Sequence, residues 1–228
     1  MNTALGYAAS LVYGYVVATV GESACHEYIQ HGRDGSLSQR WFSPFRTAKM
    51  SHELVHHKMT YKQDHVTQFR DAEEKANVDA YLDREHASTG MNEWVRAERY
   101  GVTLTWLSLL LYMGPFLPAL LIVYWVSRDL GALAVAMVPT VVAYWHSRCV
   151  HQYMHMPYER ALAECSWAMG VYLRTGLMRH IWRAHFVHHR RRTGNYNLLV
   201  GGDHLRGTYL KPSTSELRLM AQLGLPTA

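Results

Sequence analysis

Three long apolar blocks constrain this chain more than any other feature. They span residues 4–24, 101–126 and 130–150, and the second contains no charged side chain. A helix of about 20 apolar residues is roughly 30 Å long, which matches the hydrocarbon thickness of a bilayer. Membrane helices tolerate proline kinks, so Pro115 and Pro118 are expected to kink the second block. The chain is therefore predicted to cross a membrane about three times.

Positive charge is distributed unevenly around these blocks. Of the 23 Lys and Arg residues, only Arg128 would lie on the same side of the membrane as the N-terminus. Because cytoplasmic loops are enriched in Lys and Arg, residues 25–100 and 151–228 are expected in the cytoplasm. The predicted fold class is all-α: one integral membrane domain, 1–228, with about three transmembrane helices and a cytoplasmic histidine-rich helical cap. Within it, residues 58–100 are expected to form one or two solvated helices.

Charge and cysteine usage narrow the class further. The net charge of +5 indicates an anionic partner, and the apolar blocks favour a membrane surface over nucleic acid. Three cysteines without metal-site spacing argue against a disulfide-stapled secreted domain. No basic segment precedes the first block, so it is interpreted as an anchor and not as a cleaved signal.

Most of the 15 histidines gather in four clusters. The clusters are His26 and His31; His52, His56 and His57; His146, His151 and His155; and His185, His188 and His189. All four lie on the predicted cytoplasmic side or at the cytoplasmic ends of the predicted spans. His65, His86 and His204 lie outside the clusters, and surface or supporting roles are expected for them.

The spacing within the clusters has a physical meaning. Residues three or four apart share a face of an α-helix, which predicts that His52 pairs with His56. The same rule pairs the last two histidines of the third cluster and points two or more imidazoles of the fourth the same way. His26 and His31 are five apart, about 140° around an α-helix, which predicts a helix end or a kink there.

The number of clustered histidines favours two metal ions. One ion takes three or four protein ligands, so about ten histidines suit two ions. Imidazole suits Fe, Zn, Cu and Ni, and few carboxylates accompany these histidines, unlike the Glu-rich soluble di-iron bundle. Two redox metals near a bilayer indicate oxygen activation, since a lipid chain offers little else to react with.

Two alternatives stay open. His52-Glu53-x-x-His56 matches the H-E-x-x-H signature of zinc metalloproteases, in which the glutamate is the general base. That interpretation leaves at least seven clustered histidines unexplained. A metal-binding or transport protein is the other alternative, although transport requires ionisable residues in mid-membrane, and the second and third blocks have none before His146.

The order H-x4-H, H-x3-HH, H-x3-H, H-x2-HH resembles the fatty acid hydroxylase and sterol desaturase superfamily. The stretch GNYNLLVGGDHLRGT after the last pair is similar to the tail of that family. Its matching residues are Asn195, Asn197, Asp203, Gly207 and Thr208. The resemblance covers residues 26–208 apart from 58–100. The family more often has H-x2-HH in its second cluster and four spans in two hairpins, so this chain departs from it in both respects.

The resemblance implies an O2-dependent, non-haem di-iron enzyme that hydroxylates or desaturates a lipid or acyl chain. It implies two iron ions, with zinc as a substitute in purified protein, and a separate electron donor such as a ferredoxin, cytochrome or reductase. The implied ligands are His26, His31, His52, His56, His57, His151, His155, His185, His188 and His189. His180, Asn197 and Asp203 are expected to orient ligand N–H groups, with capping or turn formation as the alternative. Three arginines follow the last ligand and are expected to anchor the protein at the membrane surface or to hold a phosphate: Arg190, Arg191 and Arg192.

Overall fold

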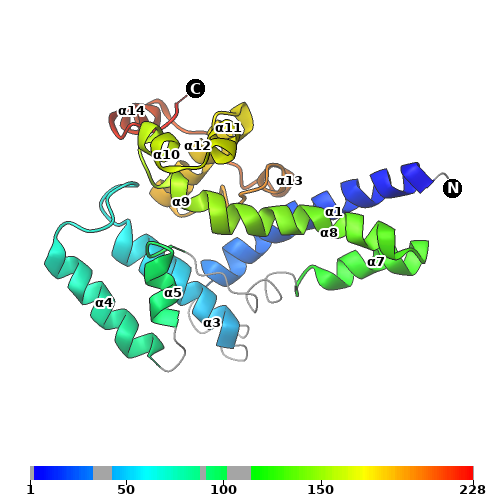
Figure 1. Ribbon diagram of the computed structural model, residues 1–228, viewed down its shortest axis with the longest axis horizontal. Helices are drawn as coiled ribbons and strands as arrows, with labels where there is room; N and C mark the ends of the chain where they lie inside the picture. Colours follow the sequence, from blue (N-terminus) through cyan, green and yellow to red (C-terminus); the bar gives the residue numbers. More distant parts are fainter. Residues whose placement is uncertain (1–2, 33–42, 88–90, 102–113, 228) are drawn as a thin grey trace.

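The computed structural model describes residues 3–32, 43–87, 91–101 and 114–227, and these residues form helices joined by turns, without a β-strand. The all-α prediction is confirmed for this part of the chain. Two continuous helices extend along the molecule (Figure 1). The first joins α1 (Thr3–Cys25) to the π-helix η1 (His26–Gln30), and the second joins α8 (Leu130–Trp145) to the π-helix η3 (His146–Val150) and α9 (His151–Met154).

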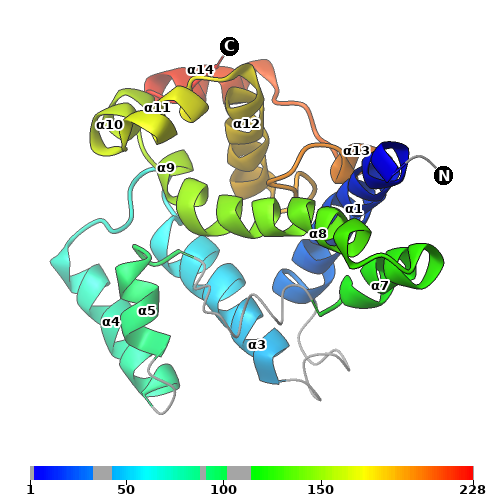
Figure 2. The same ribbon diagram turned by 45° about the vertical axis from the view of Figure 1, so that its right-hand side comes forward.

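Both helices are long and apolar enough to cross a membrane. Only 22% and 33% of their most apolar windows lie buried, unlike the core helix of a soluble protein. Large apolar side chains are exposed on them and on α7 (Leu117–Ser127), among them Val12, Trp125 and Leu130. Figures 1 and 2 show α1, α7 and α8 projecting together from one side of the molecule. Apolar surface of this extent marks contact with a membrane or another protein.

Small side chains let α1 and α8 pack closely. A Cβ atom on Gly14 would lie 2.0 Å from the carbonyl oxygen of Ala136, so only glycine fits there. Ala18, Ala136 and Ala143 are all buried. Close approach through small residues is a common basis of helix association in bilayers.

The second predicted span is described only in part. Its part 102–113 lies outside the described residues. The described part turns at 114–116, and α7 begins directly afterwards with Pro118 in its first turn. Proline is favoured in a first turn because its missing N–H would have no partner there. Pro118 therefore lies in the first turn of α7, and the kink in the second block and the third transmembrane helix stay predictions.

The tight turn predicted between the second and third blocks is present. Arg128 ends α7 in the left-handed region, with φ 55°. Asp129 then caps α8, because its carboxylate accepts the Gly131 N–H at 2.7 Å. The turn returns the chain along α7, so α7 and α8 form a hairpin.

The polar segment between the long helices begins with α3 (Ser43–Lys49), which leads into the π-helix η2 (Met50–Thr60). Beyond η2, the segment 58–100 forms two further helices, α4 (Ala72–His86) and α5 (Met91–Ala97), as the polar pattern indicates. Val55, Val78 and Leu82 are buried together and hold this pair against η2.

The C-terminal region forms a compact helical layer around α12. Its helices are α10 (Tyr158–Glu164), α11 (Trp167–Leu173), α12 (Gly176–Arg191), α13 (Gly202–Arg206) and α14 (Thr214–Gln222). Trp182 and Phe186 of α12 are fully buried among Met154 and Met220. The Thr175 side chain caps the start of α12 by accepting the N–H of residue 178. α12 is thus a rigid support for the histidines at its C-terminal end.

Candidate metal centre

A π turn brings His26 and His31, five residues apart, into one histidine group. In η1 the His31 N–H donates to the His26 carbonyl at 3.1 Å, closing a turn one residue wider than an α turn. The His151 N–H donates to the His146 carbonyl in the same way at the end of η3. π turns are rare and are frequently found at functional sites. The expected kink between His26 and His31 is therefore a π turn.

η2 pairs its histidines differently from the α-helical rule. The Nε2 atoms of His52 and His57, five residues apart, lie 3.0 Å from one another. His56 instead faces His189, with 3.1 Å between their Nε2 atoms. The rings of His52 and His56 do stack, with centroids 5.4 Å apart, but their Nε2 atoms have different partners, because the backbone of η2 is wound as a π-helix.

The fourth cluster divides between two places. α12 is a regular α-helix, and His185 and His189 lie on the same face, four residues apart. His188 faces elsewhere, with its Nε2 3.2 Å from that of His57. The expectation that two or more rings of this cluster point the same way is therefore met by His185 and His189, and His188 joins the other group.

Ten histidines form two groups. The first group is His26, His31, His52, His57 and His188, and the second group is His56, His151, His155, His185 and His189. Within each group the candidate ligand atoms all lie within 4.8 Å of one another. Two mostly buried histidine groups that could hold metal ions are thus present, and their members are the ten residues named from the sequence.

The two groups are built alike. Each takes two histidines from the end of a long apolar helix and the other three from η2 and α12. η2 gives two to the first group and one to the second, whereas α12 gives one to the first and two to the second. The groups are therefore matched in number and kind of ligand.

The spacing of the nitrogens fits a metal with right-angled ligands. Neighbouring Nε2 atoms lie 2.8–3.2 Å apart in the first group and 3.0–3.1 Å apart in the second. Around an ion with bonds of ~2.1 Å, right-angled ligands lie roughly 3.0 Å apart and tetrahedral ligands roughly 3.4 Å apart. Five nitrogens at this spacing match a six-coordinate ion with one position left for another ligand.

Hydrogen bonds on the far side of the rings direct lone pairs inward. The Nδ1 atoms of His26 and His188 face the carbonyls of Tyr196 and Gly194 at 2.6 and 3.0 Å. A carbonyl only accepts, so these Nδ1 atoms carry the hydrogen and each Nε2 presents a lone pair. Lone pairs that converge in one buried space repel each other unless a cation lies between them. The donor set therefore fits a bound metal ion.

Burial keeps these imidazoles neutral. It lowers the pKa of His188 to about 3, and the neighbouring His31 ring adds to the effect. The pKa values of His57 and His189 lie well below the ordinary value, because of burial and of the histidines around them. Neutral imidazole is the form that ligates metals.

Glu53 supports the first group from behind. One carboxylate oxygen accepts from His31 Nδ1, and the other lies 2.7 Å from Lys58 Nζ. Burial opposes ionisation, but the two contacts outweigh it and lower the pKa of Glu53 to about 2. An ionised carboxylate behind a ligand imidazole fixes the ring and raises its basicity.

A narrow crevice reaches the second group. It is lined by His56, His151 and His155 together with Tyr61 and Gly101. Its volume of about 10 Å³ is close to that of one water-sized sphere. The crevice suits a water-sized molecule, so a larger molecule would have to reach the second group by another path.

The residues expected to orient ligand N–H groups lie elsewhere. His180 stacks on Tyr209 and His204, with centroid distances of 5.5 and 6.2 Å. The Asp203 carboxylate accepts the Asn197 N–H at 2.8 Å, and the Asn197 side chain accepts the Asp203 N–H at 2.6 Å. The contacts of Asn197 and Asp203 match the alternative role, which is turn formation. Within the described residues, His180, Asn197 and Asp203 make no hydrogen bond to a histidine of either group.

That turn nevertheless positions the site. The Asn197 side chain donates to the Thr19 carbonyl at 2.6 Å, and Ser23 donates to Asp203 at 2.7 Å. Both contacts tie the loop after α12 to α1. The same loop contains Tyr196, whose carbonyl holds His26. Backbone carbonyls leave no mark in a sequence, and the only signal was the Asn-rich turn itself.

His65 and Arg191 have roles within the protein. His65 is buried, and its carbonyl accepts from His155 Nδ1 at 2.9 Å, which is a supporting role. Arg191 forms an ion pair with Glu216 of α14, at 2.9 and 2.5 Å. Arg191 thus fastens α14 to α12 and is engaged within the protein.

Comparison with protein-family models, with curated proteins and with solved structures finds no match to this chain. The resemblance to the fatty acid hydroxylase superfamily therefore continues to rest on the spacing of the histidines.

Proposed function

We propose that this chain is a membrane-embedded di-iron oxygenase that hydroxylates or desaturates a C–H bond of a lipid or acyl chain. The observation that carries the proposal is the pair of matched five-histidine groups beside the ends of two apolar helices. When bound, two irons would supply dioxygen activation, chemistry that protein side chains alone do not perform.

The chain's own residues have three tasks in this scheme. The ten histidines would hold the two ions, and the right-angled spacing favours six-coordinate iron over tetrahedral zinc. The loop after α12 keeps the rings of His26 and His188 oriented through backbone carbonyls. Burial excludes bulk water, which protects reactive species from side reactions.

The substrate class follows from where the site lies. α1 and α8 expose apolar side chains suited to lipid. First-group histidines follow the end of α1, and second-group histidines follow the end of α8. A substrate dissolved in the bilayer would therefore arrive beside the metal groups. We place the site on the cytoplasmic side, because Lys and Arg cluster in the segments that contain it. Electrons would come from a separate donor protein.

The contacts favour this function over the zinc protease. In an H-E-x-x-H site both histidines bind one ion and the glutamate faces its water. Here His52 belongs to the first group and His56 to the second. Glu53 is engaged by His31 and Lys58. The motif is therefore divided between two sites.

The test is iron content and isotope-labelled turnover in lipid nanodiscs. We expect close to two irons per chain and, with a chemical reductant and 18O2, labelled hydroxylated lipid or lipid that has lost two hydrogens. His56→Ala and His57→Ala should each lose one iron and the activity. His204→Ala, at an exposed position, is the control that should keep both.

Two outcomes would contradict the proposal. Two bound ions without oxidation of any lipid would indicate a metal-binding or transport protein. One zinc per chain with peptidase activity abolished by Glu53→Gln would establish the protease.

A further inference from the structure

The two histidine groups have equal ligand sets but unequal surroundings. The first group has a carboxylate behind one ligand, through the Glu53 contact to His31. Among the described residues, no carboxylate lies in hydrogen-bond contact with a second-group histidine. Because the ligands match in number and kind, a difference in metal affinity has to come from such surroundings.

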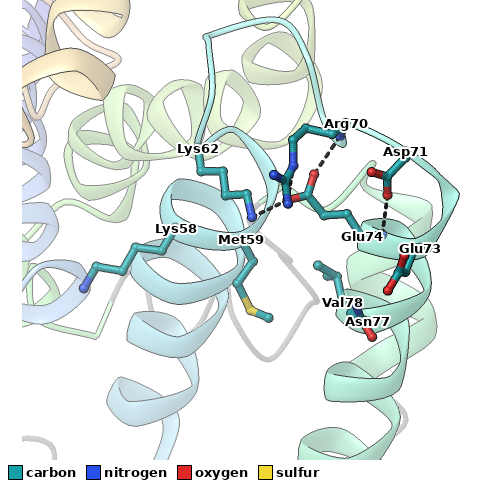
Figure 3. Close-up of a pocket in the computed structure, with 9 residues that line it drawn as sticks. All are labelled: Lys58, Met59, Lys62, Arg70, Asp71, Glu73, Glu74, Asn77 and Val78. Atoms are coloured by element: carbon teal, nitrogen blue, oxygen red, sulfur yellow. Dashed lines mark hydrogen bonds and ion pairs between the residues drawn. The ribbon is translucent and has the colours of Figure 1, made fainter.

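Lys58 contacts Glu53 from the protein surface. Figure 3 shows it at one side of the cleft between η2 and α4, pointing away from Lys62, Arg70 and Glu74. Lys62 and Arg70 each form an ion pair with Glu74, so the Glu74 charge is already balanced. Lys58 is 47% exposed and lies 2.7 Å from Glu53, which is only 12% exposed. Lys58 therefore fixes the Glu53 carboxylate in place.

Ring orientation adds to the inequality. In the first group, backbone carbonyls hold the Nδ1 atoms of His26 and His188, and Glu53 holds that of His31. In the second group, the His65 carbonyl holds His155. Rings fixed before the metal arrives lose less conformational freedom when they bind it.

We infer that the first group is the tighter metal site and fills first, and that Glu53, held by Lys58, is the positioning residue responsible. The inference rests on the proposed function only in requiring two metal ions. Partners behind metal ligands are typically worth about 10–100-fold in metal affinity. We expect a difference of that size between the two groups.

The test is titration of Co2+ into the metal-free full chain in detergent, followed by visible absorption and calorimetry. The wild type should bind two ions in two separated phases. The adjacent residues His56 and His57 identify each phase, because they belong to different groups. His57→Ala should remove the tight phase, and His56→Ala the weak one.

Glu53→Gln should weaken the tight phase by about 10–100-fold and leave the weak phase unchanged. Glu53→Asp should restore part of the loss. Glu74→Gln is the matched control, because it removes a buried ion-paired carboxylate from the cleft that Lys58 lines without touching a histidine. It should leave both phases as in the wild type, and circular dichroism would verify that each variant is folded.

Two equal phases in the wild type would overturn the inference, as would unequal phases that Glu53→Gln leaves unchanged. These results concern metal binding alone. Failure of lipid oxidation with an unequal pair of sites would overturn the proposed function and leave this inference intact.

Discussion

Acidification should unfold the metal-free protein unusually steeply. Eight histidines beyond the two long apolar helices have their pKa lowered by burial, namely His52, His56, His57, His65, His155, His185, His188 and His189. For His65 and His188 the folded pKa is about 3. Below pH 6.5 the unfolded chain binds protons that the folded chain does not, so folding stability falls as the pH falls from about 6.5 towards 3.

The size of the effect follows from the number of groups. At pH 6 each such histidine costs just under about 1 kcal/mol of folding free energy, and the eight together cost roughly 7 kcal/mol. A domain has only about 5–15 kcal/mol of stability to lose. The metal-free protein should therefore unfold near pH 6, while bound metal, which requires the same unprotonated rings, should move the transition to lower pH.

The assay is chemical unfolding of the chelator-treated protein in detergent at pH values from 7.5 to 5, followed by near-ultraviolet circular dichroism. His188→Gln should reduce the pH dependence, by at most about 1.4 kcal/mol per pH unit well below pH 6, since up to one proton fewer is taken up. His204→Ala, at an exposed site, should leave the profile unchanged. Equal free energies of unfolding at pH 5.5 and 7.5 without metal would refute the reasoning.

Two further predictions concern packing and the loop after α12. Gly14→Ala should destabilise the protein by about 1–3 kcal/mol in thermal unfolding, because its Cβ would collide with the Ala136 carbonyl, whereas Gly176→Ala, with nothing within 4 Å, should be neutral or stabilising. Asp203→Ala should cost about 2–3 kcal/mol by leaving the buried donors of Asn197 and Ser23 unpaired; a selective loss of one metal ion at unchanged stability would contradict that structural role.

The sequence predicts which histidines matter better than how they are arranged. Spacing and the apolar blocks identify the histidine clusters and the two long helices, because both depend on local pattern, and the family resemblance narrows the clusters to the ten residues. The division into two groups depends on the winding of η2, and α-helical spacing rules pair His52 with His56, which belongs to the other group. π winding is set by contacts along the whole helix and has no short signature.

Supporting residues were the hardest to predict. His180 belongs to the same helix as three group members, yet it faces Tyr209 and not a ligand. The groups that hold ligand rings are largely backbone carbonyls, at Tyr196, Gly194 and His65. Every residue has a carbonyl, so only the folded loop reveals which ones are used. Glu53 was visible in the sequence, but the protease motif suggested a different task for it.

The winding of η2 also accounts for the unusual spacing of the histidines in the second cluster. A π turn holds one residue more than an α turn, and this chain has H-x3-HH where the superfamily it resembles more often has H-x2-HH. In an α-helix, the shorter spacing would place the first and last histidines on one side and the middle one on another, as α12 does with H-x2-HH. The π winding of η2 therefore accommodates the extra residue, because it keeps His52 and His57 together although they are five residues apart.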